Sequence, residues 1–490
     1  MGIIMNRRQF FKTGSTALAL TGLAGAILPG RSGIIGTANA KETSKTHLPI
    51  PELLENIDKS GKTATFSMST QQGTVEFFKG KPTQTLGYNG SFLGPTIRVR
   101  NGQPFRLNLT NNLSETTTLH WHGLHVPAKW DGGPRQPIAS KTVWRPDFKI
   151  AQQAATLWYH PHAMGSTGKQ VYNGLAGLFY IDDEISDNLD IPKTYGIDDI
   201  PLIIQDRRFF KTGQFAYVQS MHDVINGVVG NYLLVNGAIQ PISEVHSGLV
   251  RLRILNGSNS SIYRIAFDQE LPFQVIASDG GFLERPVKMN SIVLSAGERA
   301  EVLVDFSILA LGRYVNLMVD QIGGRRFEAM KFLLSHPPDR KKTIPKIFRK
   351  IDKIPESKST KTRRFEMRTM SGMGMMGKRL TINGKQMDIN RIDEKIETNS
   401  IEIWEIVNSS GMMMSMPHSM HLHDVQFQIL SRNGKTPPLH EQGRKDTVLI
   451  LPGESVKIII HFKDYKGIYM YHCHLLEHED DGMMGQFEII

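Results

Sequence analysis

Three Asn-Gly dipeptides, evenly spaced along the chain, constrain the fold more than any other feature of the sequence. They are Asn89-Gly90, Asn236-Gly237 and Asn383-Gly384, and each lies 147 residues from the next. Asn-Gly favours a tight turn between strands. A stretch that alternates apolar and polar residues follows each dipeptide, at residues 95–100, 250–254 and 401–406. A period of this length predicts three copies of a whole domain rather than a short stacked repeat.

Each copy is rich in short alternating stretches and lacks a long amphipathic pattern. This pattern predicts an all-β fold of three Greek-key β-sandwich domains. We place the domains at residues 41–185, 186–338 and 363–490, with residues 339–362 as a linker rich in Lys, Pro and Ser. The basic residues of the linker are expected to be solvated; they are Lys341, Lys342, Lys346, Arg349 and Lys350.

Residues 1–40 resemble a twin-arginine signal peptide. Arg7-Arg8 precedes an apolar run at residues 17–28, and Ala38-Asn39-Ala40 reads as a cleavage site. The sequence therefore predicts export by the twin-arginine machinery to the periplasm or cell envelope, and leaves open whether the signal is removed. Without these residues the chain has 53 basic and 47 acidic residues. This mild charge predicts no nucleic-acid partner, and the apolar run is too short to predict a stable membrane partner.

The only cysteine, Cys473, lies between His472 and His474, with His478 and Met483 further along. One thiolate, imidazoles and a distant thioether form the ligand set of a blue-copper centre, and His418 offers a second imidazole. Because side chains alternate along a strand, Cys473 is expected to face away from its two neighbours. This arrangement suits electron transfer between two metal sites.

Four His-x-His pairs stand in matching places of the first and third copies, and the second copy has none. The pairs are His120/His122, His160/His162, His421/His423 and His472/His474. If the first and third domains face each other, eight imidazoles converge. Such a set favours copper, whereas zinc could occupy one pair but would not use the neighbouring Cys-containing site for redox chemistry.

Together these segments resemble the multicopper oxidase family, over essentially the whole mature chain. The matching motifs are His120-Trp121-His122-Gly123, Trp158-Tyr159-His160-Pro161-His162, His418-Ser419-Met420-His421-Leu422-His423, and residues 472–483 from His472-Cys473-His474 through Met483. The resemblance implies three cupredoxin-like domains. It also implies that substrate electrons pass singly through Cys473 to a trinuclear site, where dioxygen becomes water.

The resemblance further implies four coppers per chain, with one type 1, one type 2 and two type 3 ions. The type 1 ligands would be His418, Cys473, His478 and the weak axial ligand Met483. The type 2 ligands would be His120 and His421. The type 3 ligands would be His122, His160, His162, His423, His472 and His474. Glu479 matches the family's proton-donating carboxylate and Asp131 its carboxylate behind the ligands, so both are candidate catalytic residues. Asp446 is a candidate for orienting a blue-copper histidine.

The ending of the chain most resembles bacterial copper-efflux oxidases, which oxidise Cu(I) in copper tolerance. Thioethers are soft and suit Cu(I), so the candidate substrate ligands are Met373, Met376, Met414 and Met416. The alternative reading of these methionines is packing. The sequence departs from efflux members by its short Met-rich stretch, by Met414 in place of a carboxylate and by Ser419 in place of proline. Laccase-like oxidation of phenols therefore stays open. So does the role of a non-enzymatic envelope scaffold of the same fold.

Overall fold

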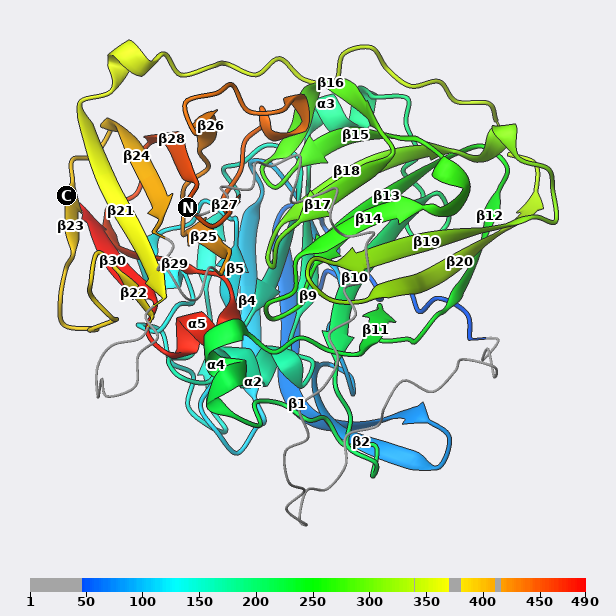
Figure 1. Cartoon of the computed structure of the whole chain (residues 1–490), viewed down its shortest axis with the longest axis horizontal. Coiled ribbons are helices and arrows are strands. Elements are labelled where there is room, and N and C mark those ends of the chain that lie inside the picture. The colour runs from blue at the N-terminus through cyan, green and yellow to red at the C-terminus, as the bar shows by residue number, and fades with distance from the viewer. Residues whose placement is uncertain (1–45, 339, 370–379, 410–415) are drawn as a thin grey trace, which may run out of the picture.

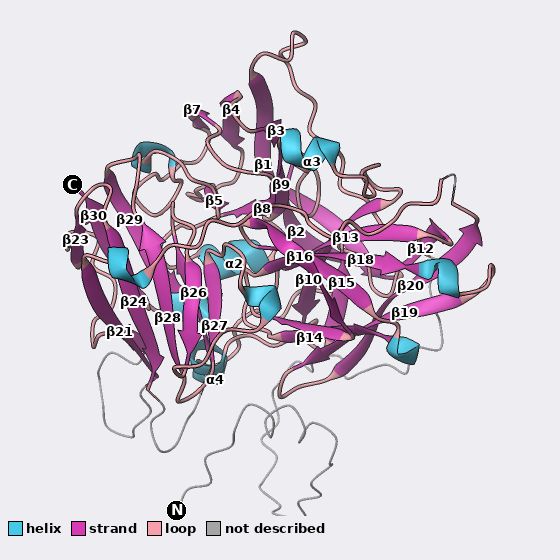
Figure 2. Cartoon of the chain, turned by 90° about the horizontal axis from the view of Figure 1, so that it is seen from above, coloured by secondary structure: helices cyan, strands magenta, loops and turns pink. Residues whose placement is uncertain are grey.

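The computed structural model describes residues 46–338, 340–369, 380–409 and 416–490, and in these ranges the chain forms three β-sandwiches. Figures 1 and 2 show the second and third sandwiches on opposite sides, with the first between them. Within the described ranges, we find no helix with the length and apolar character that crossing a membrane requires.

Each sandwich consists of two sheets, whose strands are given in their spatial order. In the first sandwich, one sheet has β2 (Lys81–Tyr88), β1 (Ala64–Phe78), β4 (Pro104–Asn111) and β6 (Val143–Trp144), with β7 (Asp147–Lys149) also paired to β4. The other sheet has β3 (Ile97–Arg100), β9 (Gly177–Asp182), β8 (Ala155–His160) and β5 (His120–His122). In the second sandwich, one sheet has β11 (Tyr232–Val235), β10 (Asp199–Arg207), β13 (Leu249–Asn256), β18 (Arg299–Asp305), β15 (Phe273–Ser278) and β16 (Gly281–Met289). The other sheet has β12 (Ile242–His246), β20 (Arg326–His336), β19 (Tyr314–Gln321), β14 (Tyr263–Phe267) and β17 (Ser291–Leu294). In the third sandwich, one sheet has β22 (Leu380–Ile382), β21 (Lys361–Thr369), β24 (Ile401–Asn408), β28 (Ser455–His461) and β26 (Gln428–Arg432). The other sheet has β23 (Glu394–Ile396), β30 (Met484–Ile489), β29 (Gly467–Cys473), β25 (His418–Leu422) and β27 (Thr447–Ile450).

Helices are short and lie between strands. They are α2 (Thr167–Tyr172), α3 (Glu184–Asn188), α4 (Met221–Asn226) and α5 (Leu476–Asp480), with the 3-10 turns η2 (Ala128–Trp130), η3 (Asp268–Glu270), η4 (Phe306–Ile308), η5 (Glu356–Lys358) and η6 (Leu439–Glu441). The apolar residues of each alternating strand fill the space between its two sheets, so each sandwich has its own buried core. The all-β, cupredoxin-like architecture predicted from the sequence is confirmed.

The Asn-Gly turns occupy the same place in every sandwich. Asn89, Asn236 and Asn383 all adopt positive φ, of 55°, 50° and 52°. The side-chain oxygen of each accepts a hydrogen bond from a strand backbone N–H, that of Ser69, Ile203 or Glu366, at 2.7 to 2.8 Å. Asn tolerates this left-handed conformation because its short polar side chain bonds locally. The spacing of these turns therefore reflects a structural repeat.

One strand equivalence inferred from the repeat is wrong. The strands at residues 250–254 and 401–406 pair in parallel with β10 and β21, the first long strands of their sandwiches. In the first sandwich the strand parallel to β1 is β4 rather than residues 97–100. Ile97–Arg100 instead pairs with β9, as β12 pairs with β20 and β23 with β30. Short alternation alone could not distinguish the two strands.

The segment between the second and third sandwiches runs along the surface at the top of Figure 1. The predicted solvation of its basic residues holds for Lys341, Lys346 and Lys350, which are exposed. It is wrong for Lys342, whose Nζ lies 2.9 Å from Asp198, and for Arg349, which pairs with Asp183. Phe348, between them, is buried and packs on Phe282. The segment is therefore attached to the body of the molecule.

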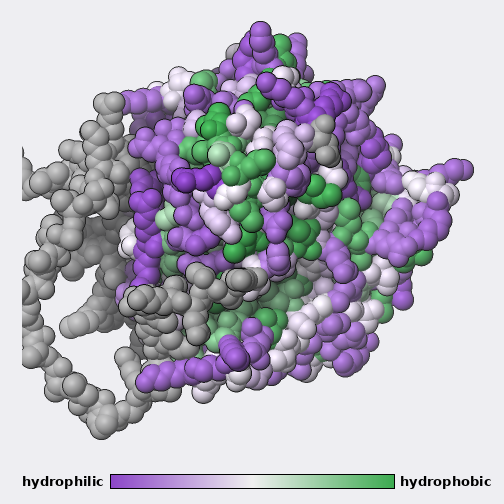
Figure 3. Space-filling model, turned by 90° about the vertical axis from the view of Figure 1, so that its right-hand side faces the viewer, coloured by the Kyte–Doolittle hydropathy of each residue, from purple (hydrophilic) through white to green (hydrophobic). Residues whose placement is uncertain are grey.

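The outer side of the second sandwich mixes apolar and polar groups. In Figure 3, which looks onto the right-hand side of Figure 1, apolar residues gather toward the middle of the face and polar residues surround them. Large apolar residues exposed in this sandwich include Ile308, Leu311 and Tyr314. Exposed apolar residues are ordinary on a protein surface.

Candidate metal centre

The four His-x-His pairs meet between the first and third sandwiches. His120 lies opposite His160 in the register of β5 and β8, and His421 lies opposite His472 in the register of β25 and β29. All eight rings are at most 1% exposed. Two pairs of neighbouring strands, one from each sandwich, thus bring the eight rings to one interface.

In three of the His-x-His pairs, the residue between the two histidines points away from the interface and into a sandwich core. Trp121 is buried in the core of the first sandwich, and Leu422 and Cys473 are buried in the core of the third. This follows from the alternation of side chains along a strand. The same alternation therefore places six of the eight imidazoles in the interface and the only thiol in a sandwich core.

The rings form groups whose inward nitrogens face one another. His122, His160 and His474 form one group, and His162, His423 and His472 form another. The Nε2 atom of His472 lies 3.1 Å from that of His162 and 3.2 Å from that of His423. His120 and His421 face each other with 3.4 Å between their Nε2 atoms, and His122 lies close to both.

The outward ring nitrogens bond to acceptors, which fixes the tautomers. His120 Nδ1 donates to the Asp131 carbonyl at 3.0 Å, His160 Nδ1 to the Pro161 carbonyl at 2.7 Å and His421 Nδ1 to the Asp446 carbonyl at 2.9 Å. A carbonyl only accepts, so these nitrogens carry the proton and the inward nitrogens present lone pairs. His122 is turned round: its Nδ1 faces His160 at 3.4 Å, and its Nε2 faces Asp446 Oδ1 at 3.1 Å.

Burial favours the neutral form of the imidazoles at this interface. Burial, then repulsion among the rings, lowers their pKa values well below 6.5 for His122, His162, His421 and His474. Burial likewise lowers the pKa of His423 to about 4. Lone pairs of neutral rings that face each other at this distance repel unless a cation lies between them. Both ring nitrogens of His474 are buried without a hydrogen-bond partner among the described residues. This donor set fits copper, which imidazole binds well.

Two buried carboxylates lie behind the rings. Glu479 is fully buried, with Oε1 3.2 Å from His162 Nδ1 and Oε2 3.2 Å from His472 Nδ1. Burial, and to a lesser extent Asp480, raises the pKa of Glu479 well above its usual range. Asp131 Oδ2 lies 2.8 Å from His423 Nδ1. Burial acts to raise the pKa of Asp131, but attraction to His423 and His120 outweighs it and holds this pKa below the usual range.

A second donor set surrounds Cys473 in the core of the third sandwich. Its Sγ lies 3.6 Å from His418 Nδ1 and 3.6 Å from His478 Nδ1. Met483 is buried in the same core, and its carbonyl accepts from the Cys473 backbone N–H at 3.0 Å. Burial raises the pKa of the Cys473 thiol to about 12, so a thiolate here requires a positive charge such as a metal ion.

The outer nitrogens of both histidines beside Cys473 are also bonded. His478 Nε2 donates to the carbonyl of Ile225, in α4 of the second sandwich, at 2.8 Å. His418 Nε2 lies 3.3 Å from Thr369 Oγ1, at the end of β21. The helix α5 that carries His478 is held by Glu477, whose oxygens accept from Asn259 Nδ2 at 2.9 Å and from the Val228 N–H at 3.1 Å. The second sandwich thus supports this donor set although it supplies none of the donors.

Of the four candidate substrate methionines, the structure describes Met416. Met373, Met376 and Met414 lie outside the described residues. Met416 is half-buried two residues before His418, and its carbonyl accepts from Asn408 Nδ2 at 2.7 Å. Met416 is therefore close in sequence to His418, one of the donors around Cys473.

Asp446 was expected to orient a histidine beside Cys473, and this is wrong. Its carboxylate contacts His122 and forms two hydrogen bonds with Arg299, at 2.7 and 2.6 Å. It therefore belongs to the eight-histidine group. Sequence reasoning missed Thr369, Ile225 and Arg299, which act through single contacts from distant strands. No spacing or motif in the sequence marks them.

Comparisons with known proteins agree with this geometry. Three models of the multicopper oxidase family match residues 69–186, 209–326 and 356–490. The chain is 38% identical over 448 residues to "Multicopper oxidase mco" of Staphylococcus aureus, covering 91% of this chain and 93% of the relative. It is also 34% identical over 497 residues to "Cell division protein FtsP" of Escherichia coli, covering 98% of both.

Solved structures give the same family. A laccase from Pediococcus acidilactici shares 37% identity, with a TM-score of 0.84 over 91% of this chain and 94% of that one. A multicopper oxidase from Campylobacter jejuni that is described as a metallo-oxidase shares 29% identity, with a TM-score of 0.78 over 91% and 98% of the two chains. With models of one family matching each of the three sandwiches, the chain belongs to the multicopper oxidases and is an oxidoreductase.

Proposed function

We propose that this protein couples the oxidation of Cu(I) to Cu(II) to the reduction of dioxygen to water, as part of copper tolerance. One observation carries the proposal: a single tripeptide joins the two donor sets. Cys473 belongs to one set, and its neighbours His472 and His474 belong to the two three-histidine groups of the other. This is the shortest covalent link that two such sites could have.

The donor chemistry supports four coppers. His418, Cys473 and His478, with Met483 as a weak axial ligand, would hold a type 1 ion. His120 and His421 would hold a type 2 ion. The type 3 pair would lie in the remaining two groups, His122/His160/His474 and His162/His423/His472. Copper bound in these sets supplies one-electron acceptance from a reductant and four-electron delivery to dioxygen.

The chain itself handles protons and ligand orientation. Reduction of one dioxygen to two waters takes four electrons, one from each of four Cu(I) ions, and four protons. We propose Glu479 as the carboxyl group that supplies protons, a role supported by its two oxygens, which face the Nδ1 atoms of His162 and His472 inside a fully buried site. Asp131 acts through His423, whose Nδ1 it holds, so we propose it as a positioning residue.

Cu(I) is the favoured reductant because soft thioethers suit it and Met416 lies two residues before His418. The likeness to a Campylobacter jejuni enzyme described as a metallo-oxidase supports the same choice. Oxidation of phenols is the second candidate, favoured by the likeness to a Pediococcus acidilactici laccase.

The deciding experiment measures oxygen uptake by copper-loaded mature protein with Cu(I) and with a simple phenol. Wild type is compared with a variant in which Met412, Met413, Met414 and Met416 are replaced by Leu. Strong uptake with Cu(I) that falls selectively in the variant supports a cuprous oxidase. Uptake that favours the phenol and ignores the replacement would identify a laccase.

A scaffold role is the candidate from another class, since the chain also resembles cell division proteins. The complete set of buried nitrogen and sulfur donors favours the enzyme. Absence of oxygen uptake from fully copper-loaded protein with either reductant would favour the scaffold instead.

We also propose export through the twin-arginine pathway to the periplasm or cell envelope, on the evidence of Arg7 and Arg8. Replacing both with Lys should keep the protein in the cytoplasmic fraction. A double variant that still reaches the envelope would contradict this route.

A further inference from the structure

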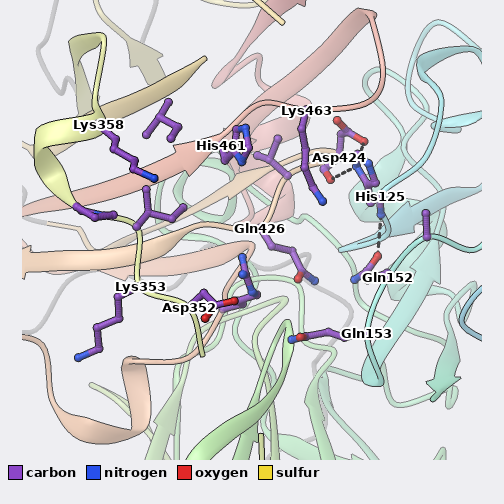
Figure 4. A pocket seen from close by; sticks show the side chains of 16 residues that line it. His125, Gln152, Gln153, Asp352, Lys353, Lys358, Asp424, Gln426, His461 and Lys463 are labelled. Atoms are coloured by element: carbon purple, nitrogen blue, oxygen red, sulfur yellow. Dashed lines mark hydrogen bonds and ion pairs between the residues drawn. The ribbon is translucent and has the colours of Figure 1, made fainter. Parts of the chain in front are cut away.

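A cleft of about 440 Å³ opens between the first sandwich, the connecting segment and the third sandwich. Figure 4 shows His125 and Gln152 on one side, Lys358 on the other, and His461, Lys463 and Gln426 between them. A volume of this size suits a small organic molecule. None of the cleft's lining residues is a donor of the two metal sets.

Three cations face this cleft. Lys358 and Lys463 point toward its middle, whereas Lys353 points away from it (Figure 4). Arg444 is the third cation and also lines the cleft. Among the described residues, the one carboxylate within ion-pair distance of Lys463 is that of its neighbour Asp464, with 3.5 Å between Nζ and Oδ2. The cleft therefore presents positive charge to whatever enters it.

Arg444 is the central cation because it is half-buried and its guanidinium has no ion pair within 4 Å among the described residues. Asp352 attracts it electrostatically from further away, but burial outweighs this attraction and lowers the pKa of Arg444. A partly buried guanidinium without a partner is unfavourable, and a planar oxyanion that bonds to two of its N–H groups would relieve that cost.

The backbone of Arg444 is fixed by the second sandwich. Its carbonyl accepts from the Gly280 N–H at 2.8 Å and from Ser278 Oγ at 2.9 Å. The next residue, Lys445, is buried with its Nζ 2.7 Å from Asp279 and 3.0 Å from Glu298. Arg444 is thus held in place by neighbours that make their own pairs, and only its side chain is left toward the cleft.

Two carboxylates also line the cleft, Asp352 and Asp424, and Asp424 is already bonded within the protein. Asp424 is 3% exposed, and its Oδ1 lies 2.8 Å from His125 Nδ1 and accepts from the Val126 N–H at 3.1 Å. The remaining wall is partly apolar, from Ile354, Pro355, Ile401 and Val425. A charged end and an apolar wall together favour a ligand with both characters over a single inorganic ion.

We propose that this cleft binds a small organic carboxylate, with its oxygens on Arg444, Lys358 and Lys463 and its apolar part against Ile354 and Val425. Neither His418 nor His478, the histidines beside Cys473, lines this cleft. It joins segments of the first and third sandwiches, because Gln152 and Gln426 in its wall both donate to the Gly123 carbonyl, at 2.8 and 3.4 Å.

Calorimetric titration of copper-loaded mature protein with benzoate tests the proposal. Benzoate carries the carboxylate and an apolar ring but no phenol hydroxyl, so it is not itself oxidised. We expect one benzoate per chain, with affinity lowered ~10-fold or more in Arg444→Gln, as for loss of a charge-assisted hydrogen bond. Arg313→Gln is the matched control, because Arg313 is exposed and does not line the cleft. It should bind as wild type does.

Additional variants and ligands identify the class of ligand and distinguish a loss of binding from misfolding of one variant. Lys358→Gln changes an exposed residue and should also weaken benzoate binding. Binding that neither Lys358→Gln nor Arg444→Gln weakens would overturn the site, as would absence of binding to wild type. Inorganic phosphate that binds as tightly as benzoate would overturn the organic-carboxylate assignment. Benzyl alcohol that binds as tightly would overturn anion recognition.

Discussion

At the scale of single residues, Thr369 is the side chain through which the described part of β21 contacts the Cys473 donor set. Because His418 turns Nδ1 toward Cys473, its Nε2 carries the proton and donates to Thr369 Oγ1 at 3.3 Å. An acceptor on the far nitrogen makes a metal-bound imidazole a stronger donor. Thr369 is thus a positioning residue that also tunes this ligand.

Replacement of Thr369 by Val keeps the shape and removes the acceptor. The weaker imidazole donor should favour Cu(I) over Cu(II), so the reduction potential of the blue centre should rise, by on the order of tens of millivolts for the loss of one hydrogen bond. Redox titration of the blue absorption measures this. Thr362→Val, at the exposed start of the same strand, is the control, and equal potentials in the two variants would contradict the role of Thr369.

Glu479 gives a second prediction at this scale. Glu479→Gln keeps the side chain's size and contacts but cannot release a proton, so dioxygen reduction should slow ~100-fold or more. Copper content and blue absorption should stay as in wild type, since Glu479 faces the outer nitrogens of His162 and His472 rather than the inward nitrogens that would hold copper. Stopped-flow reoxidation of the reduced protein measures the effect. Glu397→Gln, on the surface, serves as control, and unchanged reoxidation in Glu479→Gln would exclude it as the proton source.

The sequence could predict residues that belong to motifs but not residues that act through a distant contact. His-x-His and His-Cys-His mark themselves by spacing on a strand. Asp446 lies close to none of these motifs in sequence, and its partners His122 and Arg299 are 324 and 147 residues away. Its role depended on which strand pairs with which, and spacing in one chain does not contain that information.

At the scale of elements, the repeated Asn-Gly turn fixes where each first strand is held. Asn236 shows this most fully: its Oδ1 accepts from the Ile203 N–H, and its Nδ2 donates to the Pro201 carbonyl at 2.9 Å and the Pro49 carbonyl at 2.8 Å. One side chain therefore ties β10 to the incoming segment before the first sandwich.

Asn236→Ala should destabilise the protein by about 3 kcal/mol, from the lost hydrogen bonds and the left-handed backbone that Ala disfavours. Asn236→Gly loses the same bonds but adopts the positive φ without strain, so it should cost about 1 kcal/mol less. Urea unfolding followed by circular dichroism compares the two. Equal midpoints for Ala and Gly would show that backbone conformation contributes nothing at this turn.

The same turns show where prediction of elements succeeded and where it failed. An Asn that needs a left-handed backbone is visible in sequence, and the three turns were placed correctly. The strand that follows was misassigned in the first sandwich, because residues 97–100 and β4 alternate alike. Only pairing with β9 or with β1 separates them, and that pairing is a tertiary property.

At the scale of the whole molecule, Arg299 connects all three sandwiches at the metal centre. It lies in β18 of the second sandwich, its Nε donates to the Thr156 carbonyl of the first at 3.1 Å, and its Nη atoms bond to Asp446 of the third. Asp446 in turn faces His122. The second sandwich has no His-x-His pair, so its part in the site was invisible in the sequence.

Arg299→Met should leave Asp446 as an unpaired buried carboxylate next to His122. Breaking a buried ion pair from one side costs about 3–5 kcal/mol, and an unpaired Asp446 should no longer hold the His122 ring. We therefore expect a lower urea midpoint together with less copper per chain, while the blue absorption of the Cys473 site is kept. Arg432→Met is the matched control, because Arg432 is equally part of a buried ion-pair group, with Glu441 and Glu454, and all three of these residues belong to the third sandwich. The control should lose stability but keep its copper. If both variants lose the same fraction of copper, the loss reflects general destabilisation, and Arg299 has no particular role in holding the three-sandwich junction around the metal centre.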